Sequence, residues 1–196
     1  MTPLALFMGI ALIVLAPTIT GRIGGAVWLV AAIVLFGTSA TYHRGTWKPR
    51  SEAMLRQADH ANIFVFIAAS YTPLALGLLP SASRTTLLWL IWIVAAVGVA
   101  FELLWWTAPR WIDVILYLAM GWVALGWVNE FWTSAGPLVF GLISLGGVVY
   151  TIGAGFYALK RPNPWPRHFG HHEMFHACTI IAAICHYIAI MIATLR

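Results

Sequence analysis

Residues 84–106, RTTLLWLIWIVAAVGVAFELLWW, form a long apolar stretch in which Arg84 and Glu102 are the only charged side chains. A helix needs about 20 predominantly apolar residues to cross the hydrocarbon core of a bilayer. This stretch has that length, and it ends in a pair of Trp residues, which are typical of the membrane interface. It therefore predicts a transmembrane helix.

Similar apolar runs recur along the whole chain. We expect seven spans, at residues 2–18, 23–44, 55–79, 84–106, 111–131, 135–159 and 170–194. Breaks rich in Pro, Gly or polar residues separate them, at positions 17–21, 47–51, 80–83, 108–109, 134–137 and 162–166. No basic segment precedes the first run, so it predicts a true span and not a signal peptide. The sequence thus predicts one domain, residues 1–196, folded as an all-α bundle of seven transmembrane helices.

Composition supports this fold class. The 196-residue chain is 61% hydrophobic and 9% charged, whereas a soluble domain carries roughly 25% charged residues. The formal net charge is +5, but the basic residues are scattered through short loops without a basic arm. That distribution argues against nucleic acid as a partner. Together with the apolar composition, it indicates a multi-pass protein of the cell (inner or plasma) membrane. Membrane lipids are therefore the expected partners.

The basic residues also predict the orientation. Three of the predicted loops hold eight of them, namely Arg44, Lys48, Arg50, Arg56, Arg110, Lys160, Arg161 and Arg167. The opposite side holds Arg22, Arg84 and Arg196. Because basic residues concentrate on the cytoplasmic side, the excess predicts a cytoplasmic N-terminus and an external C-terminus, although the first span alone argues weakly for the reverse.

This topology brings ionisable residues from three distant segments to one membrane depth. His43 ends the second predicted span, Asp59 begins the third, and His172 and His176 begin the seventh. Ionisable groups near hydrocarbon usually face the bundle interior, where partners or a metal compensate them. Three imidazoles suit Zn²⁺, and three protein ligands with one open position are the catalytic form of a zinc site.

Two further side chains fit such a site. Asp59 is placed to accept a proton from a water molecule or to orient it, and Ser39 lies one turn from His43 on the same helix face. Each residue also has another interpretation. His43 could be an interfacial or core histidine, Asp59 could cap its helix, and Ser39 could be a packing residue. His168, Glu102 and Asp113 are additional candidates whose contribution the sequence leaves open.

The three motifs together resemble the hemolysin III family, the bacterial branch of the progestin and adipoQ receptors in a superfamily that includes alkaline ceramidases. The likeness is carried by SATYHRGTW (39–47), ADHANIFVFIAASYTPLAL (58–76) and HHEMFHACTIIAAICHY (171–187). It implies a seven-helix bundle with zinc near the cytoplasmic face. By residue match, it implies His43, His172 and His176 as ligands, with Ser39 and Asp59 beside the metal.

The resemblance also implies a function. Receptor relatives are associated with hydrolysis of the amide bond of ceramide, and bacterial members are named for haemolysis and linked to membrane-lipid homeostasis. We therefore expect a zinc-dependent membrane hydrolase that cleaves an amide or ester bond of a lipid. A non-catalytic membrane-state sensor with structural zinc, or a pore-forming haemolysin, is the alternative. The substrate, the metal's identity, any protein partner and the oligomeric state stay open.

One motif competes with this interpretation. His172-Glu173-Met174-Phe175-His176 matches His-Glu-x-x-His, in which zinc proteases use the Glu as general base. Membrane proteases of this type also need a later ligand from an Asp-containing segment, and no Asp follows residue 176. Glu173 projects about 100° away from the two histidines on a helix. We therefore expect Glu173 to be incidental and the chain not to be a protease.

Overall fold

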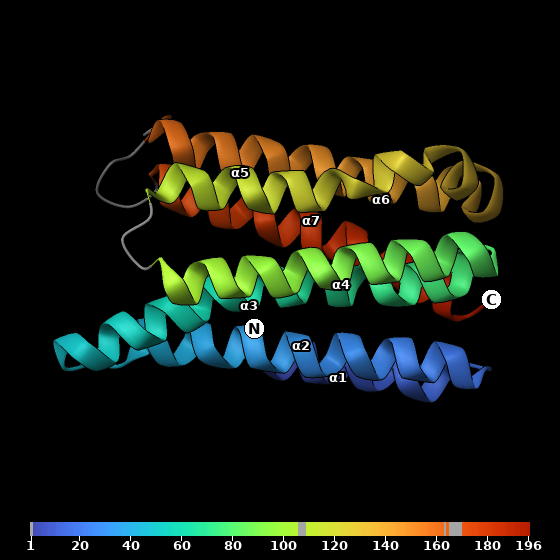
Figure 1. Ribbon diagram of the computed structural model, residues 1–196, viewed down its shortest axis with the longest axis horizontal. Coiled ribbons are helices and arrows are strands. Elements are labelled where there is room, and N and C mark those ends of the chain that lie inside the picture. Colours follow the sequence, from blue (N-terminus) through green and yellow to red (C-terminus); the bar gives the residue numbers. More distant parts are fainter. Residues whose placement is uncertain (1, 106–108, 163, 165–169) are drawn as a thin grey trace. The chain divides into compact units, whose positions relative to one another are not determined.

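The computed structural model describes residues 2–105, 109–162, 164 and 170–196. These residues form helices and no strand. In chain order the elements are α1 (Thr2–Leu15), α2 (Ile19–Arg44), α3 (Pro49–Leu78), α4 (Ser81–Leu104), α5 (Arg110–Gly121), the 3-10 helix η1 (Trp122–Trp127), α6 (Val128–Leu159) and α7 (His171–Thr194) (Figure 1). The chain divides into a first unit, Met1–Ala108 with Ala193–Arg196, and a second unit, Pro109–Ile192.

Three helices begin three to six residues earlier than the apolar runs predicted, because their first turns depend on local signals and not on hydrophobicity. Thr18 caps α2, where its hydroxyl accepts a hydrogen bond of 3.0 Å from the backbone N–H of Gly21. Proline opens the other two, with Pro49 at the start of α3 and Pro80 as the residue before α4. The fixed φ of proline suits a first helical turn, where no hydrogen-bonded N–H is needed.

Close backbone contacts hold the first unit together. The helix α2 contacts α1 and α3, and α3 contacts α2 and α4. A Cβ atom built on Gly24 would lie 2.9 Å from the Cα atom of Pro73, and one built on Gly98 would overlap the ring of Phe64. Lipid supplies no hydrophobic force between helices, so this close packing of small residues is what keeps α3 against α2 and α4.

The helix α3 is the most buried helix of the first unit. Of its most apolar window, 56% is buried, against 22–33% in the other helices long enough to span a bilayer. The sequence explains this difference, because α3 has the lowest hydropathy of the five and carries Gln57, Asp59, His60 and Asn62 near its start. Polar side chains are costly against hydrocarbon, so the helix that carries them lies inside.

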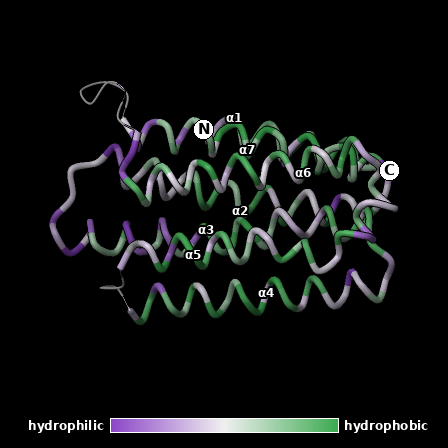
Figure 2. Tube along the Cα trace, turned by 90° about the horizontal axis from the view of Figure 1, so that it is seen from above, coloured by the Kyte–Doolittle hydropathy of each residue, from purple (hydrophilic) through white to green (hydrophobic). Residues whose placement is uncertain are grey.

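Lipid-facing surface lies on the outer helices. On α4, Trp89, Ile93 and Val97 are all more than half exposed, and their spacing of four places them on one face. The opposite face of α4, with Leu87, Ile91 and other small or apolar residues, is buried. Figure 2 shows hydrophobic colour along the middle of the helices, whereas the α2–α3 connection and the first turns of α3 are hydrophilic.

The second unit contains a helical hairpin. Trp122 and Thr151 lie 29 residues apart, about 43 Å along a straight helix, yet the indole Nε1 of Trp122 donates a hydrogen bond of 3.0 Å to the hydroxyl of Thr151. The chain must therefore turn back between them. It does so at Gly136, whose φ of 77° and ψ of 168° interrupt α6 halfway between the two bonded residues, immediately before Pro137. The break predicted at residues 134–137 is thus confirmed.

The fold class predicted from the sequence, an all-α membrane protein, is confirmed. Within the described residues, five helical stretches are long and apolar enough to cross a bilayer. One of them, Trp111–Leu159, has 49 residues and would measure about 74 Å if straight, but the turn at Gly136 divides it into two arms. The helix α1 has 14 residues, about 21 Å, which is less than the ~30 Å hydrocarbon core. The count of seven spans and the orientation stay predictions.

Replacing Gly136 with alanine should destabilise the protein by about 1–3 kcal/mol, because its φ and ψ lie in a region essentially restricted to glycine. Gly141 is a matched control within the same helix. A Cβ atom built at either position meets no atom within 4 Å, so the two substitutions differ in backbone strain alone. Gly141→Ala should leave stability unchanged or raise it by at most about 1 kcal/mol. Thermal unfolding in detergent would measure both, and equal effects would contradict the prediction.

Candidate metal centre

The structure brings two of the predicted site residues together in the first unit. His43 lies in the last turn of α2 and Asp59 in the third turn of α3. The Nε2 atom of His43 is 3.9 Å from the Oδ2 atom of Asp59. This exceeds the roughly 2.7–3.2 Å of a direct hydrogen bond. The side chain of Asp59 is 15% exposed and that of His43 is 53% exposed, so a sheltered carboxylate faces an accessible imidazole.

A polar contact one turn deeper sets the register of this pair. The amide of Asn62 on α3 donates a hydrogen bond of 3.1 Å to the hydroxyl of Thr38 on α2. Further along the same interface, the ring of Phe66 on α3 contacts the rings of Trp28 and Phe36 on α2. Since α2 and α3 run in opposite directions here, pairing Thr38 with Asn62 places His43 opposite Asp59.

Ser39 lies one helical turn before His43 on α2 and is half-buried. The spacing of four residues places both on one side of that helix, as the sequence predicted. The structure therefore holds three predicted site residues, Ser39, His43 and Asp59, at one end of the α2–α3 interface.

A second polar cluster joins α3 to α4, and sequence reasoning missed most of it. The Nδ1 atom of His60 is 3.9 Å from the Oε1 atom of Glu102, whose side chain is buried. The amide of Gln57 donates hydrogen bonds of 2.6 and 3.2 Å to the backbone carbonyl oxygens of Glu102 and Leu103. These carbonyl groups belong to the last turn of α4, where capping groups complete the hydrogen bonding, so Gln57 acts as its cap. The signal in the sequence was the spacing of three residues between Gln57 and His60, which places both polar side chains on one face of a helix.

The two clusters use different sides of α3. Asp59 and Asn62 face α2, whereas Gln57 and His60 face α4. Asp113, the other acidic candidate, is buried in the first turn of α5 in the second unit.

The remaining predicted ligands lie on α7 in the second unit. His172 and His176 belong to its first two turns, and His176 is exposed. The side chain of His172 and all of His168 lie outside the described residues. His43 belongs to the first unit, whereas His172 and His176 belong to the second. The triad of these three histidines therefore stays a prediction.

Glu173, which we expected to be incidental, caps α7. Its Oε2 atom accepts a hydrogen bond of 2.8 Å from the backbone N–H of Gly170, the residue before the helix. In this interaction, a glutamate at the third helical position accepts a hydrogen bond from the backbone N–H of the N-cap residue. Glutamate in the His-Glu-x-x-His motif therefore has a structural explanation that needs no protease.

Comparison with known proteins gives the chain a family. The model for haemolysin-III related proteins matches residues 1–187. The chain belongs to the haemolysin III-related family. Hemolysin-3 homolog of Bacillus subtilis is 30% identical over 78% of this chain and 72% of its own length. Monocyte to macrophage differentiation factor of Homo sapiens is 29% identical, over 80% and 64%. Heptahelical transmembrane protein ADIPOR2 of Oryza sativa is 31% identical, over 84% and 79%.

These matches confirm the resemblance that the sequence motifs predicted, to hemolysin III proteins and to their receptor branch. Together with the apolar helices, they confirm a multi-pass protein of the cell membrane.

Glu173→Ala should lower the free energy of unfolding by about 1 kcal/mol, because the N–H of Gly170 loses its partner. Glu173→Gln should keep stability close to wild type, since glutamine caps in the same way. Thermal unfolding and metal content of the purified variants would test this. A Glu173→Gln protein that folds but loses its activity by several orders of magnitude would restore glutamate as a general base.

Proposed function

We propose that this chain is a zinc-dependent membrane hydrolase that cleaves an amide or ester bond of a lipid. The observation that supports it best is the meeting of His43 and Asp59 across α2 and α3, 3.9 Å apart. An imidazole and a sheltered carboxylate that face each other at the end of membrane-embedded helices are the two kinds of group that a hydrolytic zinc site needs.

In the first unit, the side chain of His43 is suited to bind a metal ion. The imidazole of His43 is accessible, and its Nε2 atom is too far from Asp59 for a direct hydrogen bond. In the proposal, His43, His172 and His176 would hold Zn²⁺. Zinc bound by these residues would act as a Lewis acid, and it would lower the pKa of a bound water molecule to about 7.

The chain's own residues then have distinct roles. Asp59 orients the attacking water and accepts its proton, for which its low exposure and its fixed register with α2 are suited. Ser39, on the side of α2 that carries His43, donates a hydrogen bond to the carbonyl oxygen as negative charge develops there. The surrounding helices are apolar and face lipid, which favours a lipid as the substrate class.

The wild-type protein should bind about one zinc ion per chain, measured by elemental analysis after purification. His43→Ala, His172→Ala and His176→Ala should each lower zinc affinity by at least 10–100-fold, because even the partners of ligands contribute about this much. His171→Ala is the matched control, since this neighbour points about 100° away from the pair and should keep full zinc. Full zinc in the His43 variant would overturn the assignment.

Asp59→Asn separates an enzyme from a protein with structural zinc. It should keep zinc and fold, because the amide preserves the shape of the carboxylate, but it should lower lipid hydrolysis by about 10²–10⁴-fold. Release of fatty acid from panels of lipid amides and esters would measure this. If Asp59→Asn keeps full cellular function while the histidine variants lose stability, the membrane sensor predicted as an alternative is favoured. The pore-forming alternative also stays a prediction, which recordings of current across defined bilayers would test.

A further inference from the structure

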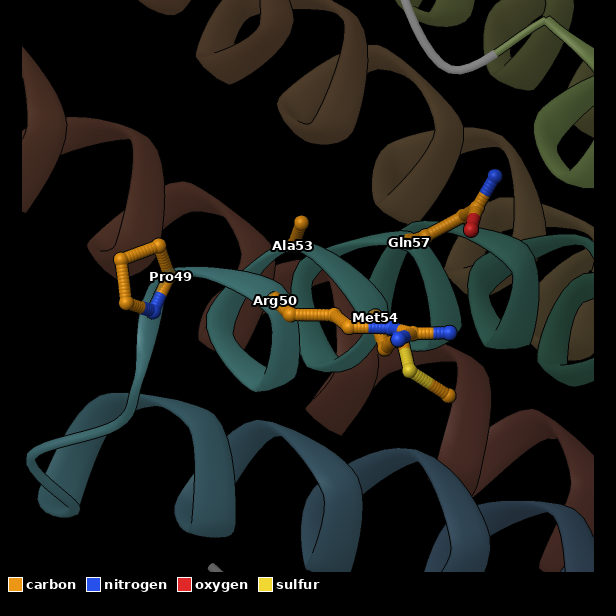
Figure 3. Close-up of a pocket in the computed structure, with 5 residues that line it drawn as sticks. All are labelled: Pro49, Arg50, Ala53, Met54 and Gln57. Atoms are coloured by element: carbon orange, nitrogen blue, oxygen red, sulfur yellow. The ribbon is translucent and has the colours of Figure 1, made fainter.

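A hollow of about 540 Å³ lies along the first turns of α3. One face of the helix forms its described wall, which consists of Pro49, Arg50, Ala53, Met54 and Gln57 (Figure 3). Spacings of four residues place these side chains in two adjacent stripes. The wall is mainly apolar, with the guanidinium of Arg50 as its charged group.

The hollow lies where α4 ends. Gln57 caps the carbonyl groups of Glu102 and Leu103, so the last turn of α4 lies level with Gln57. The helix α3 continues for eight more residues beyond this level, to Pro49, about 12 Å. Along this part of α3, the face that carries Gln57 is no longer packed against α4.

The membrane depth of the hollow follows from the length of α3. Its 30 residues span about 45 Å, whereas the hydrocarbon core is about 30 Å thick. About ten residues must therefore lie outside the core. The polar start of α3 is the end that lies outside, since its last turns, up to Leu78, are apolar. The hollow thus extends from the head-group layer toward the edge of the acyl chains.

The charge around the hollow selects its ligand. Residues 44–56 contain four basic side chains, Arg44, Lys48, Arg50 and Arg56, and one acidic side chain, Glu52, which gives a net charge of +3. Such juxtamembrane clusters attract anionic lipids. Arginine in addition binds phosphate with two parallel hydrogen bonds.

We propose that this hollow binds an anionic phospholipid of the adjoining leaflet. The guanidinium of Arg50 pairs with the lipid phosphate, and Pro49, Ala53 and Met54 contact the glycerol and the first methylene groups. Methionine adapts its shape to such flexible ligands. The hollow does not include the carboxylate of Asp59, because Arg50 and Asp59 are nine residues apart, which at about 100° per residue puts them on opposite sides of α3.

Native mass spectrometry of the full-length protein in detergent would test the proposal. Phosphatidylglycerol and phosphatidylcholine with identical acyl chains are titrated separately, and one tightly bound phosphatidylglycerol per chain is expected. Arg50→Gln should weaken its binding by more than tenfold, because a phosphate loses a bidentate charged partner. Arg44→Gln is the matched control at the same end of the molecule. It removes an equally exposed charge that does not line the hollow, and it should weaken binding by at most about fivefold.

A second pair of variants tests the shape of the hollow without changing charge. Ala53→Leu fills it and should weaken phosphatidylglycerol binding by about tenfold, from the lost space for the lipid. Ser51→Leu, on the exposed side of the same turns, should leave binding unchanged. Unfolding temperatures close to wild type would show that each variant is folded.

Three results would overturn the proposal. Equal losses for Arg44→Gln and Arg50→Gln would show diffuse attraction to a basic surface. Unchanged binding in Ala53→Leu would show that the lipid lies elsewhere. Displacement of phosphatidylglycerol by excess glycerol phosphate would show that a soluble phosphate ester is sufficient. Zinc content of Arg50→Gln should equal wild type, so failure here is distinguishable from failure of the proposed hydrolase.

Discussion

The requirement that polar groups of α3 find partners inside the bilayer governs the first unit. Water is absent from the hydrocarbon core, so an amide or carboxylate there must bond to protein. Asn62 meets the hydroxyl of Thr38 on α2, and at the edge of the core Gln57 meets the terminal carbonyl groups of α4. Each contact fixes how far one helix slides along another. The position of His43 opposite Asp59 is a consequence of this fixed register.

The same helix separates two kinds of chemistry by its surface. The side toward α2 carries the carboxylate and amide that lie near His43 and Thr38. The side toward α4 carries Gln57 and His60, and beyond the end of α4 it becomes the apolar wall beside Arg50. A single helix that is longer than the hydrocarbon core can in this way serve a buried site and the head-group layer together.

Much of the fold could be predicted from the sequence because the bilayer imposes a length on every apolar run. Residues 170–194 matched α7 within one residue, and the break at 134–137 contains the turn at Gly136. The helix starts were less predictable. Thr18, Pro49 and Pro80 act through capping and fixed backbone angles, which a hydrophobic window does not detect.

The candidate site was predictable only in part for a related reason. Topology placed His43 and Asp59 at one depth, and the structure brings their side chains together. Contacts such as those of His60 with Glu102, and of Glu173 with Gly170, depend on which side of a helix meets its neighbour or its own first turn. The His-Glu-x-x-His motif suggests a general base at Glu173, whereas the capping rule for a glutamate at the third helical position predicts the bond to Gly170 that the structure shows.

The hairpin in the second unit has a consequence for how the chain enters the membrane during synthesis. The indole N–H of Trp122 has its partner on the returning arm, at Thr151. A first arm inserted by itself would carry this donor into lipid unsatisfied, at a cost of roughly 1–3 kcal/mol. Insertion of both arms as one piece avoids that penalty. The bilayer therefore favours insertion of the two arms as a pair over insertion of the first arm alone.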